Sequence, residues 1–196
     1  MFVQIIEGKI ADAQLLERQL DAWRKDIKPG ATGFLGATGG ITPDGRTIDI
    51  VRFESESAAQ SNSKRPEQGA WWSETEKAYD GPVTFRDCRD VDVMFGGGSN
   101  DAGFVQVVQG KAKDQAAMRS MTTEMEAELR AARPDILGML VAWHGDGGFT
   151  QVVYFKTEAD ARKQESATEQ SELRERYMSM FEGAPTFYDL PSPIFD

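Results

Sequence analysis

Few polar side chains in this 196-residue sequence are placed to do chemistry, and they lie far apart along the chain. Gln4 and Gln106 each carry an amide that both donates and accepts hydrogen bonds, so either could orient a ligand carbonyl or a peroxide. Arg52 and Tyr154 could each stabilise an oxyanion. The only histidine, His144, could serve as a general base or a ligand. The candidate catalytic residues are therefore Gln106, His144, Tyr154 and Arg52, and Gln4 is a candidate for ligand binding.

Aromatic side chains could supply the walls of a pocket around these polar groups. A pocket for an aromatic molecule needs apolar walls and surfaces for stacking. The candidate ligand-binding residues of this kind are Trp23, Trp71, Trp72, Trp143 and Tyr177. Trp71 and Trp72 are adjacent, and adjacent side chains point about 100° apart on a helix, so one of them is expected near the surface or a pocket mouth.

Each of these candidates also has a purely structural interpretation. A glutamine can be satisfied by neighbouring backbone groups, and the aromatic side chains can pack in the core. His144 lies in the segment WHGDGG, which is typical of a turn. The residues alone leave these alternatives open.

Residue counts argue against a bound metal or cofactor. A single histidine and a single cysteine, Cys88, do not supply the usual ligands of zinc or non-heme iron. Nothing places a serine near His144 to form a catalytic triad. The glycines of GATGG (36–40) and GGG (96–98) do not fit a phosphate loop or a dinucleotide fingerprint. We therefore expect no metal and no cofactor.

The overall composition is that of an acidic globular protein. Hydrophobic residues make up 40% of the chain, which is enough for a core at this length. The net charge of −10 repels phosphate backbones and anionic lipids, so neither a nucleic acid nor a membrane is an expected partner. The opening MFVQIIEGK lacks the basic start and long apolar run of a signal peptide. We expect a soluble cytoplasmic protein.

The sequence contains an internal repeat. FVQIIEGK (2–9) recurs as FVQVVQGK (104–111), an offset of 102. Without a gap, the same offset aligns Asp44-Gly45 with Asp146-Gly147 and Arg52 with Tyr154. A repeat this long indicates a duplicated domain rather than a solenoid unit.

Both copies contain the same succession of predicted elements. In the first copy these are a strand at 2–9, a helix from Asp12 to about 28–30, strands at 33–41 and 46–54 joined by a hairpin at 43–45, a helical segment at 55–81 broken near Pro66, and a long strand at 82–95. The second copy has a helix beginning at Asp114, a hairpin at 144–148, a helix at 158–182 and a strand at 185–190. The order β-α-β-β-α-β is that of a ferredoxin-like unit.

This ordered set of elements resembles the dimeric α/β-barrel superfamily, and most closely its antibiotic-biosynthesis-monooxygenase branch. The segments that carry the resemblance are GFLG (33–36), FESESAA (53–59) and the strand after DGP (80–82), together with their counterparts in the second copy. The resemblance implies an α+β fold in which two tandem ferredoxin-like repeats form an intramolecular dimeric α/β barrel.

The repeat also predicts how the chain is divided. We expect a first ferredoxin-like repeat at 1–95, a Gly/Ser linker at 96–101 and a second repeat at 102–196. A short tether keeps the second copy at a millimolar effective concentration. We therefore expect a monomer with an internal pseudo-dimer, which could dimerise further.

The resemblance implies a function as well. It indicates a protein that binds a small aromatic molecule and oxidises it with O2 in the absence of a cofactor. One alternative is a non-catalytic ligand-binding or stress-related protein of the same fold. A second is a heme-degrading monooxygenase, whose relatives carry an asparagine where this chain has Gln4 and Gln106, and bind iron through a histidine on the second helix. The register places Trp71 and Leu173 near that position, and because neither ligates iron, the heme alternative is disfavoured.

Overall fold

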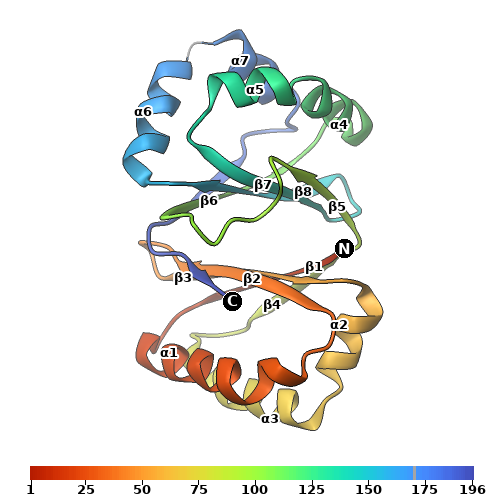
Figure 1. The fold of residues 1–196 in the computed structure, drawn as a ribbon, viewed down its shortest axis with the longest axis vertical. Helices are drawn as coiled ribbons and strands as arrows, with labels where there is room; N and C mark the ends of the chain where they lie inside the picture. The colour runs from red at the N-terminus through yellow and green to blue at the C-terminus, as the bar shows by residue number, and fades with distance from the viewer. Residues whose placement is uncertain (170) are drawn as a thin grey trace. The chain divides into compact units, whose positions relative to one another are not determined.

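The computed structural model describes residues 1–169 and 171–196, which form two compact α+β units. The first unit contains Met1–Arg89 together with Ile194–Asp196, and the second contains Asp90–Pro193. Each unit is a five-stranded antiparallel sheet with its helices on one face (Figure 1). The predicted α+β class is confirmed, with one ferredoxin-like arrangement of sheet and helices in each unit.

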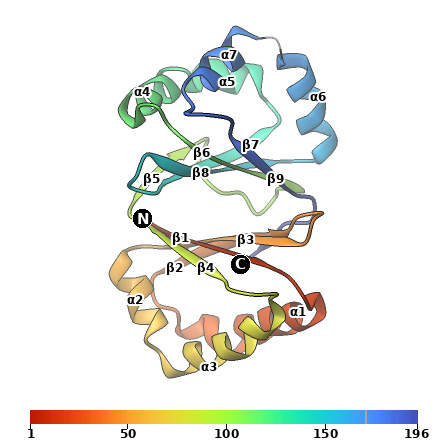
Figure 2. The same ribbon diagram turned by 180° about the vertical axis from the view of Figure 1, so that it is seen from behind.

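The first unit has the strand order β10-β2-β3-β1-β4, and Figure 2 shows α1, α2 and α3 on one face of this sheet. Its elements are β1 (Phe2–Lys9), α1 (Ala13–Ala22), β2 (Phe34–Ile41), β3 (Arg46–Phe53), α2 (Glu56–Ser63), α3 (Pro66–Thr75), β4 (Thr84–Cys88) and β10 (Ile194–Phe195). A π-helical turn at Trp23–Ile27 and a 3-10 turn at Lys28–Gly30 continue α1.

The second unit has the equivalent strand order β5-β7-β8-β6-β9. Its elements are β5 (Asp90–Met94), β6 (Phe104–Lys111), α4 (Gln115–Glu124), α5 (Glu126–Ala132), β7 (Ile136–Trp143), β8 (Gly148–Phe155), α6 (Glu158–Thr168), α7 (Glu172–Ser179) and β9 (Thr186–Leu190). None of the described helices is long and apolar enough to cross a membrane.

Capping residues begin the helices where the sequence predicts. Asp12 and Asp114 each accept a hydrogen bond, at 2.8 and 2.9 Å, from the backbone N–H three residues further on. The helical segment 55–81 is interrupted at Arg65, since the residue before a proline disfavours helical backbone. The segment 158–182 divides into α6 and α7, and Gln170 between them lies outside the described residues.

The prediction of one long strand at 82–95 is wrong, because this segment forms two strands in different sheets. β4 pairs with β1 in the first unit, whereas β5 pairs with β7 in the second. The strands separate at the exposed Arg89, whose guanidinium donates to Glu56 at 2.6 Å. Residues 90–95 thus lie with the second unit, although the sequence assigns them to the first repeat. Conversely, β10 returns from the far end of the chain to pair with β2.

Residues 96–101, expected to be a linker, approach β7 closely. A Cβ atom added to Gly138 would lie 1.7 Å from the carbonyl oxygen of Gly97. Gly138 also follows a β-bulge, because the pairing of β7 with β8 shifts register between Ile136 and Gly138. Glycine at 138 therefore permits a backbone contact that any other residue would block.

Replacing Gly138 with alanine is expected to lower the free energy of unfolding by about 1–3 kcal/mol, because the new Cβ must displace backbone. Gly69 in α3 is a matched control, since an added Cβ meets nothing within 4 Å there. Gly69→Ala should stabilise the protein by about 0.5–1 kcal/mol. Urea unfolding followed by circular dichroism measures both changes, and effects of the same sign would contradict the close approach at Gly138.

Candidate functional site

Each sheet lines a cavity with its helix-facing side, and each cavity lies within one unit. The cavity of the second unit has a volume of about 460 Å³, and that of the first unit about 130 Å³. They are called the large and the small cavity below. Pockets for small molecules usually measure about 300–1,000 Å³. The large cavity therefore has room for a small organic molecule, and the small cavity for a single chemical group.

The walls of the large cavity are mainly apolar. The strands contribute Val108, Met139 and Val153, and the helices contribute Met121 and Leu173. Methionine side chains are flexible and polarisable, so they adapt to ligands of irregular shape. The cavity therefore suits a ligand whose surface is largely hydrocarbon.

A chain of polar contacts lies along one side of the large cavity. Gln106 on β6 donates from Nε2 to Oδ1 of Asp189 on β9 at 3.0 Å. The other carboxylate oxygen of Asp189 pairs with Arg162 of α6, which also donates to Glu165 at 3.0 Å. These contacts fix the orientation of the Gln106 amide, which has a second N–H.

Tyr177 and Gln151 form a second polar pair at the large cavity. The Tyr177 hydroxyl donates to Oε1 of Gln151, whose Nε2 contacts the sulfur of Met139 at 3.2 Å. Burial raises the pKa of Tyr177. Tyr177 therefore stays protonated at neutral pH.

Two further arginines line the large cavity, and only one of them has a partner within the described chain. Arg133 donates to both carboxylate oxygens of Asp135, at 3.0 and 2.8 Å. The side chain of Arg174, by contrast, makes no hydrogen bond or ion pair with any described residue. A guanidinium with unused donors beside an apolar cavity can stabilise an anionic oxygen.

Four of the predicted ligand-binding residues line the small cavity together: Gln4, Trp23, Trp71 and Trp72. Gln4 donates from Nε2 to Asp87 at 2.9 Å, which repeats the Gln106–Asp189 contact of the second unit. The repeated contact gives both glutamines a structural role in joining the first and last strands of their repeat.

Asp49 is the most unusual residue at the small cavity. It lies on β3, the central strand, and its carboxyl makes no hydrogen bond or ion pair with any described residue. Burial, and to a lesser degree the negative charge of Asp196, raise the pKa of Asp49 to about 7. Gly39 on β2 leaves the space that the carboxyl occupies, since a Cβ there would lie 1.8 Å from Oδ1 of Asp49.

Asp196 also lines the small cavity, but its charge is compensated. Arg24 donates to its two carboxylate oxygens at 2.8 and 3.2 Å, and Lys28 lies 3.5 Å from the first of them. Asp49 is therefore the carboxyl at this cavity that lacks a cationic partner among the described residues.

Three of the four predicted catalytic residues line neither cavity. Arg52 on β3 and Tyr154 on β8 lie on the sheet faces turned away from the cavities, because side chains alternate along a strand. His144 lies in the hairpin between β7 and β8, where Nε2 is 2.9 Å from the hydroxyl of Thr150. Of the four, the structure places Gln106 at a cavity, together with the predicted ligand-binding residue Tyr177.

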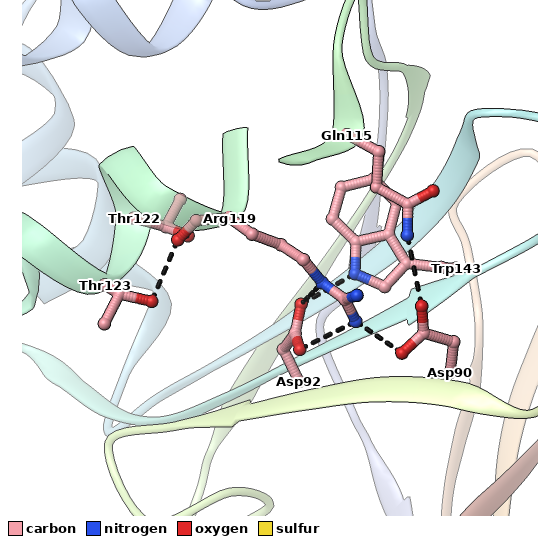
Figure 3. Close-up of polar contacts among 7 residues, drawn as sticks. All are labelled: Asp90, Asp92, Gln115, Arg119, Thr122, Thr123 and Trp143. Atoms are coloured by element: carbon pink, nitrogen blue, oxygen red, sulfur yellow. Dashed lines mark hydrogen bonds and ion pairs between the residues drawn. The ribbon is translucent and has the colours of Figure 1, made fainter. Parts of the chain in front are cut away.

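Trp143, also a predicted ligand-binding residue, lies in a polar cluster that holds β5 (Figure 3). Its indole N–H donates to Asp92 at 2.7 Å, and Arg119 of α4 lies 5.3 Å above its ring. Arg119 also donates to Asp92 at 2.7 Å and pairs with Asp90, which accepts from Gln115 at 3.1 Å. Trp143 is buried and does not line the large cavity. Its contacts anchor β5 to the second unit.

Replacing Trp143 with phenylalanine is expected to destabilise the protein by about 1–2 kcal/mol, because Asp92 loses one donor. Ligand affinity at the large cavity should stay unchanged within the error of a titration. Chemical unfolding and ligand titration of the same variant measure the two effects. A loss of affinity without a loss of stability would instead place Trp143 in the binding site.

Equivalent positions of the two units are 102 residues apart in sequence, and the residues at these positions explain why the two cavities differ in size and polarity. Positions that line the small cavity correspond to positions that line the large one, with different residues in the two units. The corresponding pairs are Trp23 and Met125, Trp71 and Leu173, Trp72 and Arg174, and Asp49 and Gln151. The three tryptophans fill space that the second unit leaves open, and Asp49, the carboxyl without a cationic partner among the described residues, corresponds to an amide in the second unit.

Sequence analysis misses Asp49, Arg162, Arg174 and Asp189 as cavity residues. A signal for Asp49 exists, since it alternates with apolar residues such as Val51 on one face of a strand. A carboxylate on an otherwise apolar face is unusual and marks a candidate site. The two arginines lie on helices rich in charged residues, where no sequence pattern separates them from arginines in solvent.

Comparisons with protein families and curated proteins give no match to this chain.

Within residues 1–169 and 171–196, no group of three or more histidine, cysteine, aspartate or glutamate side chains could hold a metal ion.

Solved structures share the fold over the whole chain. A proposed monooxygenase from Lactobacillus acidophilus NCFM is 12% identical, with a TM-score of 0.71, over 100% of this chain and 98% of that one. A proposed monooxygenase from Fusobacterium nucleatum is 8% identical, with a TM-score of 0.72, over 100% and 93%. An anthrone oxidase-like protein is 10% identical, with a TM-score of 0.67, over 100% and 92%. At these identities the likeness is one of fold.

Proposed function

We propose that the large cavity binds a small aromatic molecule with a phenolic or enolic oxygen, and promotes its oxidation by O2 without a metal or cofactor. The observation that carries this proposal is a cavity of about 460 Å³ with apolar walls, bordered by Gln106, Arg174 and Tyr177. An apolar pocket with a few polar groups is the usual form of a small-molecule site.

In this proposal the protein first stabilises the ionised substrate. The positive charge of Arg174, whose side chain has no partner among the described residues, favours the anion, and the phenolic or enolic proton is released to solvent. The second N–H of Gln106 can donate to a carbonyl oxygen of the substrate. An electron-rich anion held in this way can transfer electrons directly to O2.

The reaction is balanced with the substrate as the only reductant. For an anthrone, the methylene carbon loses two hydrogens and gains one oxygen atom to become a carbonyl. The second oxygen atom leaves as water with those two hydrogens. The substrate supplies all four electrons that reduce O2, so no external reductant is needed.

The comparisons support the choice of substrates to test. One protein with this fold is described as anthrone oxidase-like, and two others as proposed monooxygenases. For this chain, the first of these names suggests anthrones as the first substrates to test, and quinols complete the panel as electron-rich phenols.

The test measures O2 uptake with that panel, in the presence of a chelator, and identifies products by mass. Arg174→Leu is expected to lower kcat/KM about 10- to 100-fold, because a buried anion loses its cationic partner, and Arg174→Lys should restore part of the rate. Arg176→Leu is the matched control, since Arg176 is an exposed residue of α7 that does not line the cavity. No protein-dependent uptake across the panel would exclude the oxidation.

Two other outcomes would favour the alternative functions. Ligands that raise the melting temperature without turnover would indicate a non-catalytic binding protein of this fold. A Soret shift on titration with heme would favour heme degradation, although Trp71 and Leu173 carry no atom that ligates iron.

The quaternary structure stays a prediction. We propose that the chain is monomeric with an internal pseudo-dimer. Size-exclusion chromatography with light scattering should then give 21.7 kDa, unchanged on dilution. A concentration-dependent mass would show further dimerisation.

A further inference from the structure

We propose that the small cavity of the first unit is a separate site for a small organic cation, such as a quaternary or protonated amine, with Asp49 as its counter-ion. This site differs from the large cavity in ligand charge and ligand size, and it does not depend on the oxidation proposed above.

Aromatic rings form a continuous wall around the small cavity. The ring centroids of Trp23 and Phe34 are 5.0 Å apart, those of Trp23 and Trp71 are 6.4 Å apart, and those of Trp71 and Trp72 are 6.0 Å apart. Tyr79 continues the series 6.3 Å from Trp72. All five rings line the cavity. The faces of aromatic rings attract cations, and tryptophan does so most strongly.

Asp49 supplies the charge that such a wall lacks. An unpaired carboxyl on the central strand of a sheet is unfavourable, because ionisation there has no compensating partner. Gly39 keeps the space for it open. A bound cation would compensate the negative charge of the Asp49 carboxylate. Cation binding would therefore offset the cost of placing this residue in the cavity.

The surrounding charges favour a cation over an anion. Among the described residues, no lysine or arginine lines the small cavity, and Asp49 and Asp196 are the charged residues that do. Arg24 and Lys28 neutralise Asp196. The tyrosine that faces Asp49, Tyr79, has a raised pKa and stays neutral. The charge of this cavity therefore changes with pH through the ionisation of the Asp49 carboxyl.

The volume limits the ligand. At about 130 Å³, the small cavity has less than a third of the volume of the large one, which is about 460 Å³. A trimethylammonium group is of this size, whereas a polycyclic phenol is too large. The equivalent positions of the second unit, with Gln151 for Asp49 and Arg174 for Trp72, lack this chemistry.

The test uses tetramethylammonium and choline, with binding followed by tryptophan fluorescence and calorimetry. The neutral isostere of choline, 3,3-dimethylbutan-1-ol, controls for shape. We expect the cations to bind at least about tenfold more tightly than the alcohol. The affinity for tetramethylammonium, whose charge does not titrate, should rise about tenfold from pH 6 to pH 8, as Asp49 ionises with a pKa of about 7.

Two variants connect the effect to Asp49. Asp49→Asn should abolish the preference for the cations and the pH dependence. Asp26→Asn, which removes one exposed charge of the same unit outside the cavity, should change neither. Equal binding of choline and the alcohol, or an unchanged pH dependence in Asp49→Asn, would overturn the proposal. The oxidation substrate is absent from this assay, so its result is independent of the function proposed for the large cavity.

Discussion

Replacing Asp49 with asparagine is expected to stabilise the protein at pH 8 and to have little effect near pH 4. The pKa of this carboxyl is raised from 3.8 to about 7 in the folded protein, so between these values the unfolded chain ionises and the folded protein does not. Wild-type stability therefore falls as pH rises from 4 to 7. Asparagine does not ionise and avoids this loss, which amounts to about 2–4 kcal/mol at about 1.4 kcal/mol per pKa unit.

Urea unfolding between pH 4 and pH 8 measures this difference. Trp23, Trp71 and Trp72 lie in the first unit and Trp143 in the second, so a Trp143→Phe background lets fluorescence report on the first unit alone. Asp26→Asn controls for the loss of one negative charge. A gain of stability that is the same at every pH would mean that Asp49 titrates normally in the folded protein.

Leu173→Trp is expected to close much of the large cavity and to weaken binding of a tricyclic ligand by about tenfold or more, a cost of at least about 1.4 kcal/mol. Leu173 is half-buried on α7, lines the large cavity, and corresponds to Trp71 of the smaller cavity. The substitution thus copies into the second unit a residue that the first already accommodates. Isothermal titration with the best ligand of the panel measures the change.

Leu173→Ala is the matched control for this variant, because it enlarges the cavity and should retain binding of the same ligand. Both variants should unfold within about 1 kcal/mol of the wild type, since position 173 is only half-buried. Binding that is insensitive to tryptophan at 173 would place the ligand outside the large cavity.

Much of the fold can be predicted because its signals are local. FVQIIEGK and FVQVVQGK mark the same strand in both repeats, and Asp12 and Asp114 mark the following helices through their own capping contacts. The segment 82–95 shows the limit of local signals. Its strand propensity is continuous, but β4 and β5 pair with partners about fifty to eighty residues away in sequence, and no local pattern encodes that choice.

The cavities are predicted less completely for a similar reason. Alternation along β3 places Asp49 on the same sheet face as Val51. The raised pKa of Asp49, however, depends on its burial by other strands and helices that bring it no compensating partner among the described residues. The tryptophans are easier to find, because large aromatic residues are rare and are expected either in the core or at a pocket. Arg174 differs from an exposed arginine only through the tertiary packing of α7, which the sequence of that helix does not reveal.

The short β10 strand has a consequence for how the protein is made. A ribosome produces residues 1–89 first, but β2 then has a free edge, because its second partner is Ile194–Phe195. Until those residues are synthesised, the edge is open to strands of neighbouring nascent chains. Asp196, which borders the small cavity, also arrives only then. The unit that is translated first is therefore completed last, and a product that terminates near residue 190 would keep an open, aggregation-prone edge on β2.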